Sequence, residues 1–389
     1  MLPSLWSRCP QIIAHPEPLE EAGVSAQCND RQAAKDYRIH FRSDGLTLST
    51  AEYARLLTRL AENEGIAADE FSRDGVVTRL EERMAVMLGK ETAVFLPSGT
   101  LANHLALRLL ARRGRRVLVQ RESHIYNDSG DCVQALSGLT LIPLSPGRAT
   151  FEVDEVAAEV VRAEEGRVAT PVGVISIESP VRRVVGEVFD FAEMQRIAAF
   201  ARERRIGLHL DGARLFLAQP YTGIAPHIYA ALFDTVYVSL YKYFNAASGA
   251  VLAGPRQLLA NLYHQRRMFG GGLRQAWPYA AVALHYLDGF GERFGRAAQA
   301  ADNLFGALRE HGRCEILRSA AATNVSRLHV RGSGAADLPE RLLEDGIAVR
   351  PALHASAEGA EFELFTNETI LRRPIAEVID TFLDTLGPA

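Results

Sequence analysis

The chain has 389 residues, which predicts two domains, and its 48% hydrophobic and 23% charged residues are ordinary for a protein that folds in water. The formal net charge of −4 argues against binding to nucleic acid or an anionic membrane surface. No apolar run reaches the length of about 18 residues that spans a membrane, and no signal peptide is evident. Because the four cysteines are far apart and form no CxxC pair, we expect no disulfides, no metal site and a reducing, cytoplasmic location (Cys9, Cys28, Cys132 and Cys314).

Residues 1–36 contain four prolines and no clear period, and we interpret them as an N-terminal extension. From residue 37 onward, short apolar strands alternate with helices. The predicted strands are 37–45 (with a turn), 93–96, 116–120, 139–144, 172–177, 207–210, 235–239 and 250–253. The predicted helices are 49–63, 76–88, 101–112, 153–163 and 191–204. This alternation indicates a three-layer α/β fold, a mostly parallel sheet with helices on both faces.

The pattern changes after residue 256. A long helical region, about 257–311, is interrupted at 270–275 by three consecutive glycines, which favour a turn over a helix interior. From residue 314 the pattern is α+β, with predicted strands at 326–330, 348–350 and 361–365 and helices at 336–345 and 374–386. We therefore predict a large domain at 37–289 and a smaller C-terminal α+β domain at 290–389.

Three side chains with complementary chemistry follow two of the predicted strands. Asp211 and Arg214 come after strand 207–210, and Lys242 comes after strand 235–239. Pyridoxal phosphate (PLP) enzymes need an acid at the pyridine nitrogen and a lysine that forms a Schiff base, and an arginine can bind a carboxylate. An acid and an arginine in one turn also form structural salt bridges, and a lysine is usually exposed. The apolar and aromatic neighbours of Lys242 argue against a surface position.

Other residues at strand ends could hold a phosphate or a ring. Ser98, Gly99 and Thr100 begin a predicted helix, whose free N–H groups form an anion site, although a simple helix cap explains them too. Ser239 and Arg274 are further candidates for the phosphate, and His124 is either a structural histidine or a residue that stacks on a ring. In open α/β sheets, ligands bind at the carboxyl ends of the strands, where most of these residues fall.

Six segments in order resemble the L-threonine aldolase and β-eliminating lyase family of fold type I PLP enzymes. The similarity runs from about Arg42 to Gly272 and continues more weakly to the C-terminus. The segments are Phe41–Asp44, Leu96–Asn103, Ser123–Tyr126, Leu208–Leu215, Lys242 with Gly249–Gly254, and Gly270–Gln275. Each segment is modest alone, and their shared order makes the resemblance specific.

The resemblance implies a role for each candidate. Lys242 would form the Schiff base, Asp211 would pair with the ring nitrogen and His124 would stack on the ring. The phosphate would be held by Gly99 and Thr100, with Arg274 reaching across from a neighbouring subunit. Ser43 and Arg214 would bind the substrate carboxylate. Members of the family form dimers or tetramers with shared active sites, so we expect a homo-oligomer that acts on a small amino acid.

The reaction implied is retro-aldol cleavage of a β-hydroxy-α-amino acid, such as L-threonine or L-allo-threonine, to glycine and an aldehyde. Two kinds of alternative stay open: another PLP reaction (β-elimination, transamination or racemisation), or a PLP-fold protein without catalysis.

Several departures from the family pattern favour an altered substrate site. The usual Ser-Lys-Gly is Tyr241-Lys242-Tyr243, and the glutamate-led segment after the middle strand reads Glu178-Ser179-Pro180-Val181. A tyrosine in the early loop aligns with Phe71, and a second active-site histidine has no counterpart in Glu164–Ser176. A family arginine that grips the carboxylate aligns with Glu363, where an acid is expected to repel that group, and Arg350 is the candidate substitute.

Overall fold

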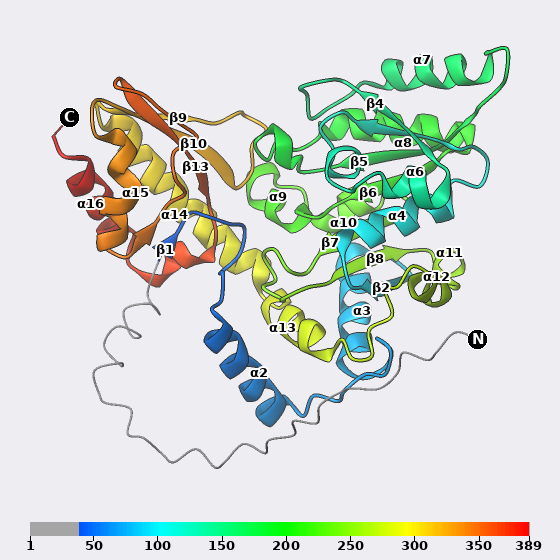
Figure 1. Cartoon of the computed structure of the whole chain (residues 1–389), viewed down its shortest axis with the longest axis horizontal. Helices are drawn as coiled ribbons and strands as arrows, with labels where there is room; N and C mark the ends of the chain where they lie inside the picture. Colours follow the sequence, from blue (N-terminus) through cyan, green and yellow to red (C-terminus); the bar gives the residue numbers. More distant parts are fainter. Residues whose placement is uncertain (1–38, 389) are drawn as a thin grey trace, which may run out of the picture. The chain divides into compact units, whose positions relative to one another are not determined.

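The computed structural model describes residues 39–388, and the predicted extension at 1–36 lies outside them. The central element is a seven-stranded sheet in the order β2-β8-β7-β6-β5-β3-β4 (Figure 1). Its strands are β2 (Thr92–Leu96), β3 (Arg116–Gln120), β4 (Thr140–Leu144), β5 (Val172–Glu178), β6 (Gly207–Asp211), β7 (Thr235–Ser239) and β8 (Ala250–Gly254). Five neighbouring strands, β7 to β4 in the sheet order, are parallel, and β8 runs antiparallel to both β2 and β7. The predicted mostly parallel sheet is confirmed.

Alternate residues of the strands pack on two separate layers of helices, as a sheet buried on both faces requires. Val236 and Val238 share one core with residues of α3 (Gly75–Leu88), α7 (Val153–Glu164) and α8 (Phe191–Arg204). Tyr237, between these two valines, belongs to a second core with α4 (Gly99–Leu110) and α12 (Leu262–Met268). α6 (Cys132–Ser137) packs with β3 and β4 in a third cluster. The three-layer α/β prediction is therefore confirmed.

Local sequence signals explain where several helices begin and end. α2 (Thr50–Glu64) starts after the N-cap Ser49, which forms a capping box with Glu52. α3 ends at Gly89, whose left-handed backbone (φ 61°) is the conformation that glycine adopts without strain. Short helices also occur that the apolar period does not predict, namely α5 (His124–Asn127), α9 (Leu215–Thr222) and α10 (Pro226–Ala230), whereas α11 (Arg256–Leu259) lies at the start of the predicted helical region.

The C-terminal region contains a four-stranded antiparallel sheet in the order β12-β13-β10-β9. Its strands are β9 (Cys314–Leu317), β10 (Val325–Arg331), β12 (His354–Ala355) and β13 (Gly359–Phe365). α13 (Trp277–Leu287) packs against α3, and the helices of the C-terminal region are α14 (Phe290–Glu310), α15 (Leu338–Glu344) and α16 (Ile375–Leu386). The sequence does not predict β9 or β12, and the predicted strand 348–350 is β11 (Ile347–Ala348).

The start of the described chain packs with its end. β1 (Ile39–His40) pairs in parallel with β11, so residues placed in the large domain by sequence lie beside the C-terminal region. This pairing positions the segment 42–45, which lines the site described below. The boundary between residues 289 and 290 stays a prediction.

Two chemical features of residues 39–388 bear on the composition-based expectations. Cys132 and Cys314 are free thiols. Within these residues, none of the helices combines the length and the apolar character needed to cross a membrane.

Candidate active site

A cavity of about 450 Å³ lies at the carboxyl ends of the parallel strands. It brings together seven of the residues predicted from sequence: Ser98, Gly99, Thr100, His124, Asp211, Arg214 and Lys242. They come from the segments that follow β2, β3, β6 and β7. Strand register explains part of the convergence, because Asp211 stands opposite Glu178 on β5 and Tyr237 on β7.

The start of α4 forms one wall of this cavity. Ser98 is the N-cap, and its hydroxyl accepts a hydrogen bond from the Leu101 N–H (3.3 Å). Gly99 packs so closely on Tyr237 that an added Cβ would stand 1.9 Å from the Tyr237 hydroxyl. Glycine is therefore required here for steric reasons, and the first N–H groups of the helix stay open to an anion.

A chain of buried hydrogen bonds holds the Asp211 carboxylate. Asn103 on α4 donates to Asp211 Oδ2 (2.5 Å), and the Ala213 N–H donates to Oδ1 (3.1 Å). His209 Nε2 lies 2.9 Å from Asn103 Oδ1, and its Nδ1 lies 2.8 Å from the Thr235 hydroxyl. Burial lowers the pKa of His209 to about 4, so the ring is neutral at pH 7 and donates through Nε2. This network fixes the orientation of the Asp211 side chain.

Lys242 lies mostly buried among charged and aromatic groups. Its Nζ is 5.7 Å from the centre of the Tyr241 ring. Burial and, secondarily, the Arg214 charge lower the pKa of Lys242 to about 8, against the pull of Asp211, Asp44 and Glu178. A large fraction of this lysine is therefore the neutral amine near pH 8, which is the nucleophilic form.

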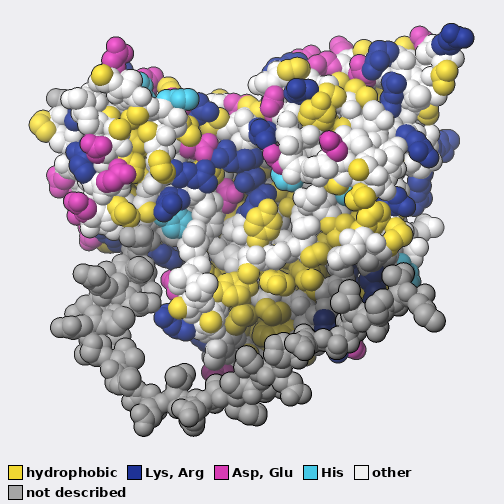
Figure 2. Space-filling model, in the orientation of Figure 1, with side chains coloured by type: hydrophobic (Ala, Val, Ile, Leu, Met, Phe, Trp, Pro, Cys, Tyr) yellow, Lys and Arg dark blue, Asp and Glu magenta, His cyan; other side chains and the backbone are white. Residues whose placement is uncertain are grey.

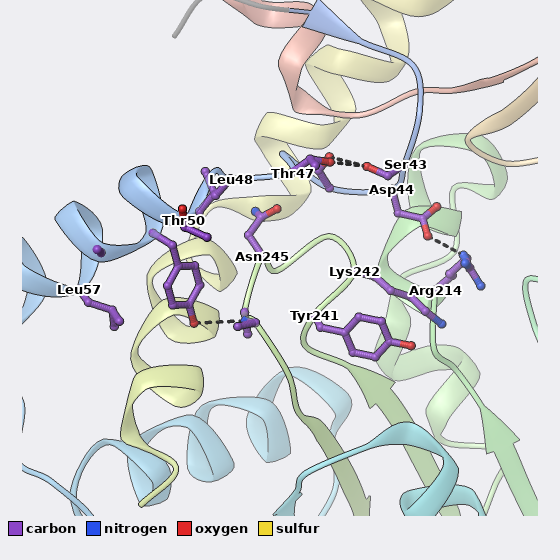
Figure 3. Close-up of a pocket in the computed structure, with 15 residues that line it drawn as sticks. Ser43, Asp44, Thr47, Leu48, Thr50, Leu57, Arg214, Tyr241, Lys242 and Asn245 are labelled. Atoms are coloured by element: carbon purple, nitrogen blue, oxygen red, sulfur yellow. Dashed lines mark hydrogen bonds and ion pairs between the residues drawn. The ribbon is translucent and has the colours of Figure 1, made fainter. Parts of the chain in front are cut away.

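Lys242 and Arg214 also border a second cavity, of about 710 Å³, shown in Figure 3. Arg214 Nε donates to Asp44 Oδ2 (2.8 Å), and Asn324 donates to Asp44 Oδ1 (3.0 Å). Arg214 and Asn324 hold the pKa of Asp44 below its usual value in spite of its burial. Ser43 lines the same cavity, where its hydroxyl shares a hydrogen bond with Thr47 (2.7 Å).

The segment that carries Ser43 and Asp44 packs tightly on the lysine loop. At Gly45, an added Cβ would stand 2.1 Å from the Lys242 carbonyl oxygen. The Leu46 N–H donates to Asn245 Oδ1 (2.7 Å). The glycine thus permits the close approach of this segment to the lysine loop.

Three predicted residues lie outside the lining of the two cavities. Ser239 is fully buried at the end of β7, and its hydroxyl makes no hydrogen bond within residues 39–388. Arg274 is exposed and forms an ion pair with Glu70, so in one chain it does not reach the cavity. Arg350 donates to the Arg42 carbonyl oxygen (2.7 Å) and to Glu363 (3.2 Å).

The expectation that Glu363 repels a carboxylate is wrong on structural grounds. Glu363 is buried, and it accepts two hydrogen bonds from Arg182 (2.7 and 3.1 Å) and one from Arg350. The cluster contains two cations and one acid, and it therefore carries a net positive charge. The sequence could not reveal this, because residues 182, 350 and 363 come from separate segments.

Sequence reasoning also assigned no role to several residues at this site. Glu178 accepts hydrogen bonds from the His124 N–H (2.6 Å) and the Arg182 N–H (3.1 Å). Burial and the nearby Asp211 raise the pKa of Glu178 to about 7. The sequence signal that could have identified Glu178 is its position directly after the predicted strand 172–177. Asn103 and His209 stand in the quoted motifs, but only the fold shows that they hold Asp211.

The residues present fit PLP. An amine with a lowered pKa, a carboxylate held by two donors and an open helix N-terminus face one cavity. The buried Ser239 hydroxyl, without a partner in the described residues, is a further donor near the end of the same sheet.

Comparison with known proteins places these observations in a family. Residues 40–331 match the family described as beta-eliminating lyase. A low-specificity L-threonine aldolase of Candida albicans is 32% identical over 251 residues, and the match covers 64% of this chain and 66%, just under two thirds, of that relative. An alanine racemase of Cochliobolus carbonum is 29% identical over 67% of this chain and 65% of its own length.

A solved structure shows the same architecture. A Listeria monocytogenes protein, assigned as an L-allo-threonine aldolase, superimposes with a TM-score of 0.76 at 26% identity, over 92% of this chain and 98% of its own. The family match covers most of the chain, and the structural likeness extends it to the C-terminal sheet. The chain therefore belongs to the β-eliminating lyase family.

Proposed function

We propose that this protein is a PLP-dependent lyase that cleaves a β-hydroxy-α-amino acid, of the threonine or allo-threonine type, to glycine and an aldehyde. The observation that carries the proposal is the meeting of Lys242, Asp211 and the α4 N-terminus at one cavity in a chain of this family. The names of the Candida and Listeria relatives support the choice of substrate.

Each residue has a role that its surroundings support. When bound, PLP would supply the electron sink that cleavage of the Cα–Cβ bond requires. Lys242 attaches the cofactor, and Asp211, held by Asn103, keeps the ring nitrogen protonated. His124 covers the ring. The N–H groups at Ser98, Gly99 and Thr100, together with Ser239, hold the phosphate.

The substrate and the proton need further groups. Ser43, Arg214 and Arg350 are the predicted carboxylate-binding residues. The reaction requires a base that takes the β-hydroxyl proton, and His124 and Glu178 are the candidates in the cavity. With a pKa of about 7, Glu178 exchanges a proton near neutral pH. We also propose a cytoplasmic homo-oligomer, a dimer or tetramer in which Arg274 of a neighbouring subunit completes the phosphate site.

The reaction is tested by purifying the protein with PLP and supplying L-threonine, L-allo-threonine, L-serine and L-alanine. We expect glycine and acetaldehyde from the two threonine isomers, measured by chromatography and by coupled reduction of the aldehyde. Pyruvate and ammonia from serine would indicate β-elimination instead. D-alanine from L-alanine would indicate racemisation, the second candidate, which the similarity to the Cochliobolus racemase favours.

Cofactor attachment should depend on pH through Lys242. A depressed pKa means that the neutral amine accumulates above pH 8 instead of above pH 10.5. We expect the rate of PLP attachment to the apoprotein to rise about tenfold per pH unit below pH 8 and to level off above it. Stopped-flow absorbance would follow the reaction, with Nα-acetyl-lysine as the control amine. A rate that keeps rising to pH 10 would contradict the lowered pKa.

A further inference from the structure

Glu363 lies between two arginines on the C-terminal sheet. Both terminal nitrogens of Arg182 donate to the two Glu363 oxygens, at 3.1 and 2.7 Å, and Arg350 Nη1 donates to Oε2 at 3.2 Å. The Glu363 side chain is only 8% exposed. One carboxylate cannot neutralise two guanidinium groups, so this cluster retains one positive charge. Figure 2 shows basic side chains gathered on the same face between β13 and α9.

Phe365 holds both arginines in place. It lies two residues after Glu363 on β13, and therefore on the same face of the strand. The guanidinium carbons of Arg182 and Arg350 lie 4.8 and 4.4 Å from the centre of its ring. These cation–π contacts restrict the orientation of each guanidinium group. The charge is thus positioned before any ligand binds, which lowers the entropic cost of binding.

Arg182 is the member of this cluster that lines the cavity of Lys242 and Asp211. Its terminal nitrogens are paired with Glu363, yet a guanidinium has five N–H donors, so the edge with Nε stays available for a second carboxylate. The other cavity arginines are matched one to one. Arg214 is paired with Asp44, and Arg183 is paired with Asp128 (2.5 and 3.1 Å). Arg182 is therefore the cavity arginine whose acid is shared with a second arginine, Arg350.

We propose that Arg182 binds the α-carboxylate of the amino acid and that Glu363 is a positioning residue that aims it. This inference rests on the proposed amino-acid chemistry of the site. It adds an arginine in the segment after β5 to the proposed carboxylate site of Ser43 and Arg214, and it gives Arg350, which lines neither cavity, a supporting role beside Phe365. The chain would then prefer amino acids over amines or amides that lack the α-carboxylate.

The test compares glycine with glycinamide, which differ in the carboxylate. Both are titrated against the PLP-loaded protein, and the change in cofactor absorbance gives each Kd. In Arg182→Gln we expect the Kd for glycine to rise roughly 10- to 100-fold, as for a lost charge-assisted hydrogen bond, while the Kd for glycinamide stays within about twofold. Arg182→Lys should recover part of the loss, because the charge returns without the two-pronged geometry.

Matched variants make the result decisive. Arg331→Gln removes an exposed arginine from β10 that pairs with Glu315 (3.6 Å), and both Kd values should be unchanged. Glu363→Gln should weaken glycine binding, since Arg182 loses the carboxylate that holds its guanidinium group in position. An unchanged Kd for glycine in Arg182→Gln would overturn the proposal. So would equal losses for both ligands, which indicate a structural role, and so would tighter glycine binding in Glu363→Gln.

The proposed lyase reaction is tested by a separate experiment. Cleavage of threonine is assayed on the unaltered protein, whereas the carboxylate test uses binding alone. A protein that binds glycine in an Arg182-dependent way without cleaving threonine would support this inference and reject the lyase reaction. A PLP-loaded protein whose absorbance does not respond to glycine would reject the inference.

Discussion

Replacing Lys242 by alanine should abolish the absorbance band of covalently attached PLP and lower threonine cleavage by about 10⁴-fold. Lys242 is the amine at the cavity, and burial lowers its pKa to about 8, which makes it the reactive lysine at neutral to mildly basic pH. The measurement is an absorbance spectrum of the purified variant with added PLP, together with aldehyde release from L-threonine.

Lys90→Ala is the matched control. Lys90 donates from Nζ to the Phe233 carbonyl oxygen (2.5 Å) and lines neither cavity at Lys242. Its loss should cost about 1 kcal/mol of stability and leave the absorbance band intact. If the band persisted in Lys242→Ala, another amine would be the attachment point and the assignment of the site would fail.

Replacing Asp211 by asparagine should leave the cofactor attached but lower cleavage by about 10³-fold. The amide cannot supply the negative charge that stabilises a protonated ring nitrogen, so the ring withdraws electrons less strongly. The amide keeps the shape of the side chain, and its one oxygen can still accept from either Asn103 or the Ala213 N–H, so the main change is the loss of charge. Absorbance and kcat, measured on the same preparation, separate the two effects.

Asp234→Asn provides the comparison for this second variant. Asp234 accepts from the Leu208 N–H (2.8 Å) near the start of β7, and an asparagine oxygen can accept the same bond. Its kcat should match that of the unaltered protein. Full activity of Asp211→Asn would show that the charge at the ring nitrogen is not required, and loss of attached PLP would show that Asp211 mainly positions the cofactor.

The neutral state of His209 bears on how Asp211 works. Burial lowers the pKa of His209 to about 4, so its imidazole is uncharged. It therefore does not compete with the pyridine nitrogen of PLP for the Asp211 carboxylate. It acts through Asn103. When the amide oxygen of Asn103 accepts from the His209 imidazole, its amide nitrogen must face Asp211. A single amide thus transmits the orientation of a buried histidine to the proposed catalytic acid.

Much of the fold and of the cofactor site could be predicted from the sequence, because both depend on local patterns. Apolar runs bounded by helices predict a parallel sheet, and the ends of its strands form one edge. Ser49 and Gly89 carry the cap chemistry that places the ends of two helices. For the same reason, Ser98 to Thr100, His124, Asp211 and Lys242 could be placed together before their distances were known.

The tertiary structure alone decided the charge balance and the geometry of the substrate side. Glu363 reads as a repulsive acid in sequence, yet two arginines from distant segments enclose it and reverse the sign of the cluster. Likewise, β1 joins β11 and so brings Asp44 to Arg214 and Asn324. Strand period and turn chemistry act over a few residues, whereas ion pairs depend on which segments the fold makes neighbours. The sequence therefore determined the cofactor half of this protein, and tertiary packing determined the half that faces the substrate.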